Sequence, residues 1–261
     1  MNALPRYWIL DPRPEEKARE HPLLGAVNLP FESRIEVSEL PAPGQPIGLP
    51  IGYVSLGEIP EILLSRNPIV WVEPRFGECP RGRLWSVNPW FAAVLPSLPQ
   101  GSRIIDLGAG HGREAIYTTA QGFTVEAVDH LPELKERGQT MANRYLDDDC
   151  LARIQFTCGD LRTRAAHLEP EDVVVSIRVG GEAIADAVEA ALEAQRFPKL
   201  WLGVFFTQEH RERLGKSYSD HDTWEGFANR LKNRPGLSLS SQLVRNHRES
   251  VVCCQIRMRQ S

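Results

Sequence analysis

Short apolar runs alternate with amphipathic segments in the part of the chain that follows residue 100. Runs of this length predict buried strands, and the segments between them have helical periodicity and helix-forming composition. The predicted strands are residues 103–107, 123–129, 154–158, 173–177 and 200–206. The predicted helices are residues 112–121, 132–145 and 183–194. Such alternation predicts an α/β fold whose mostly parallel sheet is covered by helices on both faces.

The last part of the chain has a different pattern. Residues 237–244 and 250–258 alternate between apolar and polar positions, and the polar segment 245–249 joins them. This pattern predicts an antiparallel hairpin at the end of the sheet. Cys253 and Cys254 are neighbours in the second strand of the hairpin, so their side chains point to opposite faces. We expect one of them in the core and the other at the surface.

Prolines separate the chain into two parts. Sixteen of the 20 prolines lie in residues 1–100. Proline fixes φ and removes a hydrogen-bond donor, so the first part should consist of short elements joined by many turns. We expect one domain over residues 1–83 and a second over residues 84–261. In the linker, Ser86 or Asn88 is suited to cap a helix that has Pro89 in its first turn. We expect Trp85 and Trp90 to pack the two parts together, the alternative being that they line the active site.

Composition and charge exclude several classes of protein. The 261 residues are 42% hydrophobic and 25% charged, which is ordinary for a globular protein. The net charge is −4, with −2 on each side of residue 100, and this even distribution argues against an electrostatic nucleic-acid binder. No apolar run approaches the roughly 20 residues that span a membrane, and the N-terminus lacks the pattern of a signal peptide. Five scattered cysteines form no disulfide framework. We therefore expect a soluble, cytoplasmic protein without a membrane partner.

A glycine-rich turn follows the first predicted strand of the second part. Asp106, Gly108, Gly110 and Gly112 have the spacing D-x-G-x-G-x-G, and Arg113 stands where a dinucleotide-binding fingerprint would have its third glycine. Ligands of open α/β sheets bind at the carboxyl ends of the strands. A glycine there removes the Cβ atom from the path of a ligand. The turn therefore predicts a ligand-binding loop, but one that differs from the dinucleotide type.

Acidic residues also follow the next two predicted strands. Asp129 closes the second strand, and Asp160 comes shortly after the third. An acid at the end of the second strand can accept hydrogen bonds from both hydroxyl groups of a ribose. Three acids at three successive strand ends, together with the glycine loop, predict a nucleoside-containing ligand.

This constellation resembles motif I and the following acids of class I S-adenosylmethionine (SAM)-dependent methyltransferases. The resemblance implies SAM as cofactor, with the loop around its amino-acid end, Asp106 in contact with that end directly or through water, and Asp160 at the adenine amino group. The cofactor-binding residues that it implies are Asp106, Gly108, Ala109, Gly110, Arg113, Asp129, His130, Gly159, Asp160, Leu161 and Arg178. The terminal hairpin also suits this family, whose seventh strand is antiparallel. The alternatives are a nucleotide fold with another ligand, or a fold that has lost binding.

The segment LGAGHGREAIYTTAQGFTVEAVDHLPE narrows the resemblance. It is similar to tellurite-resistance (TehB-type) methyltransferases in the pair Gly112-Arg113, the later pair Gly122-Phe123 and the acid Asp129. The similarity covers residues 84–206 well and the tail weakly. It implies a small-molecule acceptor with a soft nucleophile, namely a thiol, a metalloid oxyanion or a similar group.

The segment after the fourth predicted strand bears on the acceptor. Enzymes that methylate amide or exocyclic nitrogens often carry Asn/Asp-Pro-Pro-aromatic there, and residues 175–180 lack it. The Pro-Cys of cytosine C5 enzymes is also missing, because Cys79-Pro80 has the reverse order. Both absences argue against a nucleic-acid substrate. Methyl transfer is a direct displacement that depends on in-line positioning, so no catalytic base is assigned.

Positive or hydrogen-bonding groups are needed to hold such an acceptor. The candidates are Arg178, His210, Arg211 and His221. The alternative for residues 208–221 is a solvated loop whose charges pair with one another. Neither C-x-x-C nor H-E-x-x-H occurs in the chain, so we expect no metal site.

Near the N-terminus, residues 7–16 and 24–30 resemble the rhodanese signature. The shared features are an apolar strand, Asp11 and Arg13 in Asp-x-Arg, an acidic helix, and Gly-Ala-x-Asn-x-Pro at residues 25–30. Rhodaneses carry sulfur on a loop cysteine, and the corresponding residues 52–57 contain none. A persulfide forms on a thiolate, and Cys79 is the only thiol in this part. We therefore expect an inactive rhodanese-like module, the alternative being an irregular cap on the methyltransferase.

The sequence thus favours a SAM-dependent methyltransferase that acts on a small molecule. Two alternatives remain: a non-catalytic protein that binds SAM or a related nucleoside, and a rhodanese-type sulfur carrier that uses Cys79.

Overall fold

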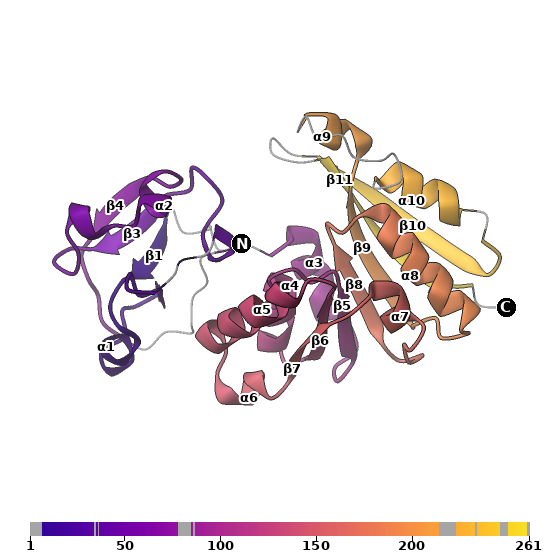
Figure 1. Cartoon of the computed structure of the whole chain (residues 1–261), viewed down its shortest axis with the longest axis horizontal. Helices are drawn as coiled ribbons and strands as arrows, with labels where there is room; N and C mark the ends of the chain where they lie inside the picture. Colours follow the sequence, from indigo (N-terminus) through magenta and orange to yellow (C-terminus); the bar gives the residue numbers. More distant parts are fainter. Residues whose placement is uncertain are drawn as a thin grey trace. The chain divides into compact units, whose positions relative to one another are not determined.

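The chain forms two compact units, one of residues 1–86 with 143–146 and one of residues 87–142 with 147–261. In the computed structural model, the residues described are 7–33, 35, 37–77, 85, 87–213, 223–232, 234–245 and 250–259. Each unit contains its own sheet (Figure 1). His221, Cys79 and Ser86, which the sequence singled out, lie outside the described residues.

The larger unit is built on a seven-stranded sheet in the order β10-β11-β9-β8-β5-β6-β7. Its strands are β5 (Arg103–Leu107), β6 (Thr124–Asp129), β7 (Ile154–Cys158), β8 (Val173–Ile177), β9 (Leu200–Phe206), β10 (Leu237–Arg245) and β11 (Ser250–Met258). Strands β5 to β9 pair in parallel. Strand β11 pairs antiparallel with both β9 and β10. The predicted mostly parallel sheet with a terminal antiparallel hairpin is confirmed.

Helices lie on both faces of this sheet. They are α3 (Pro89–Val94), α4 (Arg113–Ala120), α5 (Pro132–Tyr145), α6 (Asp148–Leu151), α7 (Leu161–Ala165), α8 (Gly181–Glu193), α9 (Gln208–Arg213) and α10 (Trp224–Leu231). Figure 1 shows α7, α8 and α10 along one face and α4 and α5 along the other. Asn88 caps α3 as predicted, because its side chain accepts a hydrogen bond from the Phe91 N–H at 3.1 Å.

Both cysteines of the hairpin are buried, because side chains pack against both faces of the sheet. Cys254 belongs to the core cluster beneath α8 and α10, and Cys253 packs with Val204 and Val251 on the opposite face. The prediction that one of the two is a surface residue is therefore wrong. Trp90 packs against the second of these clusters, within the larger unit.

The smaller unit has a parallel sheet in the order β2-β1-β3-β4. Its elements are β1 (Trp8–Asp11), α1 (Glu15–Glu20), β2 (Ala26–Asn28), η1 (Val37–Glu39), β3 (Ile47–Pro50), η2 (Leu56–Glu58), α2 (Glu61–Leu64) and β4 (Ile69–Val72). Asp11 and Arg13 form the expected local pair, with Oδ1 of Asp11 2.8 Å from Nε and Oδ2 2.7 Å from Nη2 of Arg13. The short elements agree with the many prolines of this part.

Several helices of the larger unit were not expected from the sequence. Residues 208–213 form α9, so the expected loop is wrong for that stretch. The short helices α6, α7 and α10 were also not predicted. Within the described ranges, no helix is long and apolar enough to cross a membrane.

Candidate functional site

The glycine loop between β5 and α4 has a left-handed backbone at each of its glycines. Gly108, Gly110 and Gly112 have φ values of 78°, 55° and 75°. L-residues avoid this region because Cβ comes too close to the following carbonyl oxygen. The N–H groups of Gly108 and Ala109 both donate to the Val128 carbonyl, at 2.8 and 3.1 Å. These bonds fasten the loop to the end of the neighbouring strand β6.

The three glycines serve different purposes. A Cβ atom at Gly108 would lie 2.4 Å from Cγ2 of Val179, and one at Gly112 would lie 2.5 Å from Cε1 of Phe156. These two glycines therefore permit close packing within the protein. A Cβ atom at Gly110 would meet no atom within 4 Å. Of these three glycines, only Gly110 borders open space, and there the expectation that a glycine makes room for a ligand stays a prediction.

Asp129, the last residue of β6, is hydrogen-bonded to the glycine loop. Its Oδ2 accepts from the Gly110 N–H at 2.9 Å, and its Oδ1 accepts from the Leu131 N–H at 3.2 Å. The exposed ring of His130 also lies close, with Nδ1 3.2 Å from Oδ1. A carboxylate has about four lone-pair sites, so both oxygens keep the capacity to accept from a ligand hydroxyl.

Asp106 is buried beside two other acids. Its side chain in β5 is 3% exposed. Burial raises the pKa of Asp106 well above its usual value, and the charges of Glu114 and Asp129 raise it further. A ligand cation at this place would favour the ionised carboxylates. Glu114 lies in the first turn of α4, and its carboxylate accepts from the Asn88 N–H at 3.3 Å.

The third predicted acid, Asp160, caps a helix. It precedes α7, and its Oδ1 accepts from the backbone N–H and the hydroxyl of Thr163 at 2.7 and 2.9 Å. These hydrogen bonds lower the pKa of Asp160. The neighbouring Gly159 N–H donates to the Asp129 carbonyl at 2.9 Å. Gly159 and Leu161 therefore lie at the same sheet edge as the glycine loop, and the cap by itself accounts for an acid at position 160.

Arg178 lies on the other side of the loop. It follows β8, the strand that pairs with β5 on the side away from β6. The Arg178 N–H donates to the Val204 carbonyl at 2.8 Å. Its φ of 61° is uncommon for a residue other than glycine. The adjacent Val179 touches the loop at Gly108. The structure thus brings Arg178 to the same edge as Asp106 and Asp129, and half-buried Arg113 opens α4 at that edge.

His210 and Arg211 are packed inside the fold. Their side chains are 5% and 8% exposed. The Ser250 N–H donates to Nδ1 of His210 at 3.3 Å, and the His210 ring stacks on Phe206 with centroids 4.7 Å apart. The Arg211 guanidinium lies 5.8 Å from the centre of the same Phe206 ring. These contacts correct the expectation of a solvated loop and give both residues a packing role at the end of β9.

Sequence reasoning missed three residues of the site, namely Glu114, Phe156 and Val179. Glu114 carried a usable signal, because an acid in the first turn after a glycine loop lies close to that loop. The packing of Val179 and Phe156 against glycines depends on the tertiary fold alone. Among the residues that the structure describes, no group of three or more His, Cys, Asp or Glu side chains is arranged to hold a metal ion.

Comparisons with known proteins relate this architecture to solved structures. No family model matches the chain, and no curated protein matches it significantly in sequence. The chain is similar to the cofactor-bound Rv0187 from MTB, with 14% identity over 67% of this chain and 83% of that one and a TM-score of 0.54. It is also similar to the methyltransferase domain of bacterial CtHen1, with 18% identity over 64% of this chain and 95% of that one and a TM-score of 0.50.

A TehB-like SAM-dependent methyltransferase from Corynebacterium glutamicum matches with 17% identity over 65% of this chain and 86% of that one. Its TM-score of 0.44 is too low to support the narrower resemblance. Likenesses at this level of identity show the fold and leave the activity to be argued from the site. The chain has the α/β Rossmann-like methyltransferase fold with a mostly parallel sheet.

Proposed function

We propose that this protein transfers the methyl group of SAM to a small-molecule acceptor. The observation that carries the proposal is the hydrogen bond between the Gly110 N–H and Asp129, beside the one loop glycine that borders open space. It joins the open space beside Gly110 to an acid at the end of the second strand. The fold of the solved methyltransferase domain supports the same reading.

The residues at this edge fit SAM in charge and shape. Asp129 would accept from the ribose hydroxyls while it holds Gly110, because each of its oxygens has a second lone pair. Glu114 and Asp129 lie near buried Asp106, and the ammonium group of the amino-acid end would favour the ionised form of these carboxyl groups. Gly159, Asp160 and Leu161 are the residues that we expect around the adenine, with His130 and Arg113 at the margins. SAM, when bound, supplies an electrophilic methyl group on a sulfonium.

The acceptor side requires positioning more than proton transfer. A thiolate or metalloid oxyanion attacks the methyl carbon in line, and its soft electron pair needs little help from a base. Arg178 is exposed at the same edge and carries the positive charge that would hold such an anion. We propose a TehB-like acceptor class of thiols, metalloid oxyanions and similar small nucleophiles, with no nucleic acid or membrane as partner.

For the smaller unit, we propose a rhodanese-like module without sulfurtransferase activity. Its support is local: the bidentate Asp11–Arg13 pair, the parallel sheet, and Asn28, whose Nδ2 donates to the Arg13 carbonyl at 2.7 Å. The loop that follows β3 contains no cysteine. A persulfide therefore has no thiol to form on at that loop.

A methyl-transfer assay tests the proposal. Purified protein is incubated with SAM labelled in the methyl group and with a panel of thiols, selenite and tellurite, and labelled products are separated from SAM. We expect a methylated product from at least one of these acceptors, lost in Asp129→Ala and kept in the surface control Asp148→Asn. Binding of SAM without transfer to any acceptor in the panel would favour the non-catalytic alternative.

A further inference from the structure

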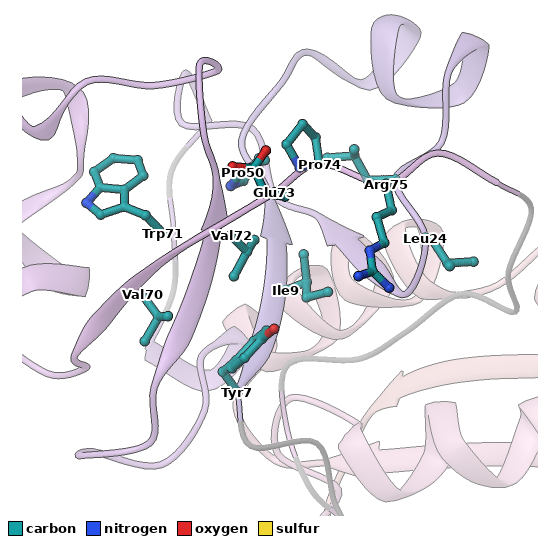
Figure 2. Close-up of a pocket in the computed structure, with 11 residues that line it drawn as sticks. Tyr7, Ile9, Leu24, Pro50, Val70, Trp71, Val72, Glu73, Pro74 and Arg75 are labelled. Carbon is teal, nitrogen blue, oxygen red and sulfur yellow. The ribbon is translucent and has the colours of Figure 1, made fainter.

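A pocket of about 470 Å³ opens on one face of the smaller sheet, and all of its lining residues belong to the N-terminal unit (Figure 2). The register of the strands shows which side chains form the floor of this pocket. Ile9 pairs with Gly48, Gly48 with Val70, and Pro50 with Val72, so these side chains share one face. A pocket of this volume with an apolar floor is of the size that holds a small molecule.

Gly48 shapes the pocket. A Cβ atom there would lie 2.9 Å from Cδ2 of Tyr7 and 3.1 Å from Cγ1 of Val72. Glycine at this position lets the Tyr7 ring lie directly against the sheet and form a wall. Leu10 and Leu49, on the opposite face, are completely buried, whereas Ile9, Val70 and Val72 are only half-buried. The pocket face is thus the face with apolar surface left to cover.

The apolar surface of this protein is concentrated in the same unit. Of the 11 large hydrophobic side chains exposed among the described residues, eight lie between Leu24 and Phe76. One of them, Leu24, lines the pocket and is 42% exposed.

One cation faces this apolar space. The Arg75 side chain extends toward Ile9 on the floor of the pocket, whereas Glu73, which also lines the pocket, lies beside Pro50 (Figure 2). The Arg75 backbone is fixed, because its carbonyl accepts from the Leu24 N–H at 2.7 Å. Within the described part of the chain, the Arg75 guanidinium and the Tyr7 hydroxyl have no hydrogen-bond partner. A guanidinium grips a carboxylate through two parallel hydrogen bonds, and the Tyr7 hydroxyl can add a third.

We propose that this pocket binds a small molecule that has an apolar body and a single carboxylate group. The apolar body would lie on Ile9, Val70 and Val72, and the carboxylate would pair with Arg75. This pocket belongs to a different unit from the proposed SAM site, so its binding of a carboxylate does not depend on whether the protein transfers methyl groups.

Calorimetric titration of the full-length protein with carboxylate probes tests this proposal. The probes are octanoate and 3-phenylpropionate, and octanamide and 3-phenylpropionamide are their uncharged counterparts. We expect both carboxylates to bind between about 10-fold and about 100-fold more tightly than the amides, the range that charged hydrogen bonds provide. Arg75→Gln should reduce the affinity for the carboxylates to that for the amides and leave the affinity for the amides unchanged.

Two controls test whether a change in affinity comes from the pocket. Arg19→Gln removes an exposed arginine of α1 that does not line the pocket, and it should leave all affinities unchanged. Arg75 is itself exposed, so Arg75→Gln should fold, which circular dichroism verifies. Equal affinity for carboxylate and amide, an unchanged affinity in Arg75→Gln, or no binding of any probe would overturn the proposal.

Discussion

The backbone N–H of Gly110 donates a hydrogen bond of 2.9 Å to Oδ2 of Asp129. This bond joins the glycine loop after β5 to the acid that ends β6, so the two parts of the proposed cofactor site are held as one unit. The Gly108 and Ala109 N–H groups strengthen the same junction by donating to the Val128 carbonyl. A substitution at Asp129 should therefore change the loop as well as remove a ligand contact.

Alanine substitutions at two of the loop glycines should affect the free energy of unfolding and SAM binding differently. Gly108→Ala combines a left-handed backbone with a clash against Val179, so we expect it to lower the free energy of unfolding by about 2–4 kcal/mol. Gly110→Ala meets no neighbour and should cost only about 1–2 kcal/mol. Its new methyl group enters the open space, so SAM binding should be lost.

Urea denaturation and calorimetry together measure both effects. The double variant Gly108→Ala/Val179→Ala is a control, because the smaller side chain at 179 removes the clash and should restore part of the stability. Equal destabilisation by the two alanines, or tight SAM binding by Gly110→Ala, would contradict this account of the loop.

Because of buried Asp106, we expect the free energy of unfolding to depend on pH in a particular way. The pKa of Asp106 is raised in the folded protein by burial and by the charges of Glu114 and Asp129. Above about pH 4, the usual range of an unfolded aspartate, the unfolded chain releases this proton while the folded protein retains it. The unfolded state then binds fewer protons, so Asp106 reduces the free energy of unfolding increasingly as the pH rises toward the folded pKa.

Asp106→Asn removes this titration while it keeps the shape of the side chain. We expect the stability of the variant relative to the wild type to increase as the pH rises above about 4. Urea denaturation at a series of pH values gives the difference directly. If the difference in free energy of unfolding between the variant and the wild type does not grow as the pH rises, the pKa of Asp106 is not raised in the folded protein, which would contradict this prediction.

Asp160 has a structural role that can be separated from a ligand role. Asp160→Ala removes the cap of α7 and should lower the free energy of unfolding by about 1 kcal/mol. Asp160→Ser keeps a capping oxygen and should retain most of that stability. If Asp160 also contacts the adenine, both variants should bind SAM more weakly. Unchanged SAM affinity in Asp160→Ser would leave the helix cap as the sole function of the acid.

Arg178 combines an uncommon backbone conformation with a proposed contact to the acceptor. Arg178→Gly relieves the left-handed strain at φ 61° and should raise the free energy of unfolding by about 1 kcal/mol. The same variant should raise the KM for an anionic acceptor. Steady-state kinetics with an acceptor from the methyl-transfer panel checks this, and an unchanged KM would remove Arg178 from the acceptor site.

The sequence predicted most of the larger sheet because its strands are apolar runs separated by clear turn residues. The predicted ranges of β5, β7, β8, β9 and β11 agree with the observed strands. Helix α9 was missed because Gln208–Arg213 contains no apolar residue, and the structure buries His210 and Arg211 of this helix. Hydrophobic periodicity has no means of finding a helix whose inner face is polar.

The sequence predicted which acids lie at this sheet edge, but it did not predict how the loop glycines pack. Asp106 near the end of β5, Asp129 at the end of β6 and Asp160 just after β7 do lie at one sheet edge, because these adjacent strands are parallel. The sequence assigned one purpose to all of the loop glycines, whereas Val179 and Phe156 account for two of them. Contacts of that kind come from residues distant in the chain, and local spacing does not reveal them.

Calorimetric titration with SAM and S-adenosylhomocysteine tests the central claim most directly. The wild type should bind both at micromolar or tighter Kd. Asp129→Ala should lose binding, and Asp129→Asn should be intermediate because its amide oxygen can still accept from Gly110. Asp148→Asn, on the exposed helix α6, should bind like the wild type. Failure of the wild type to bind either ligand, or full binding by Asp129→Ala, would contradict the assignment of this sheet edge as a SAM site.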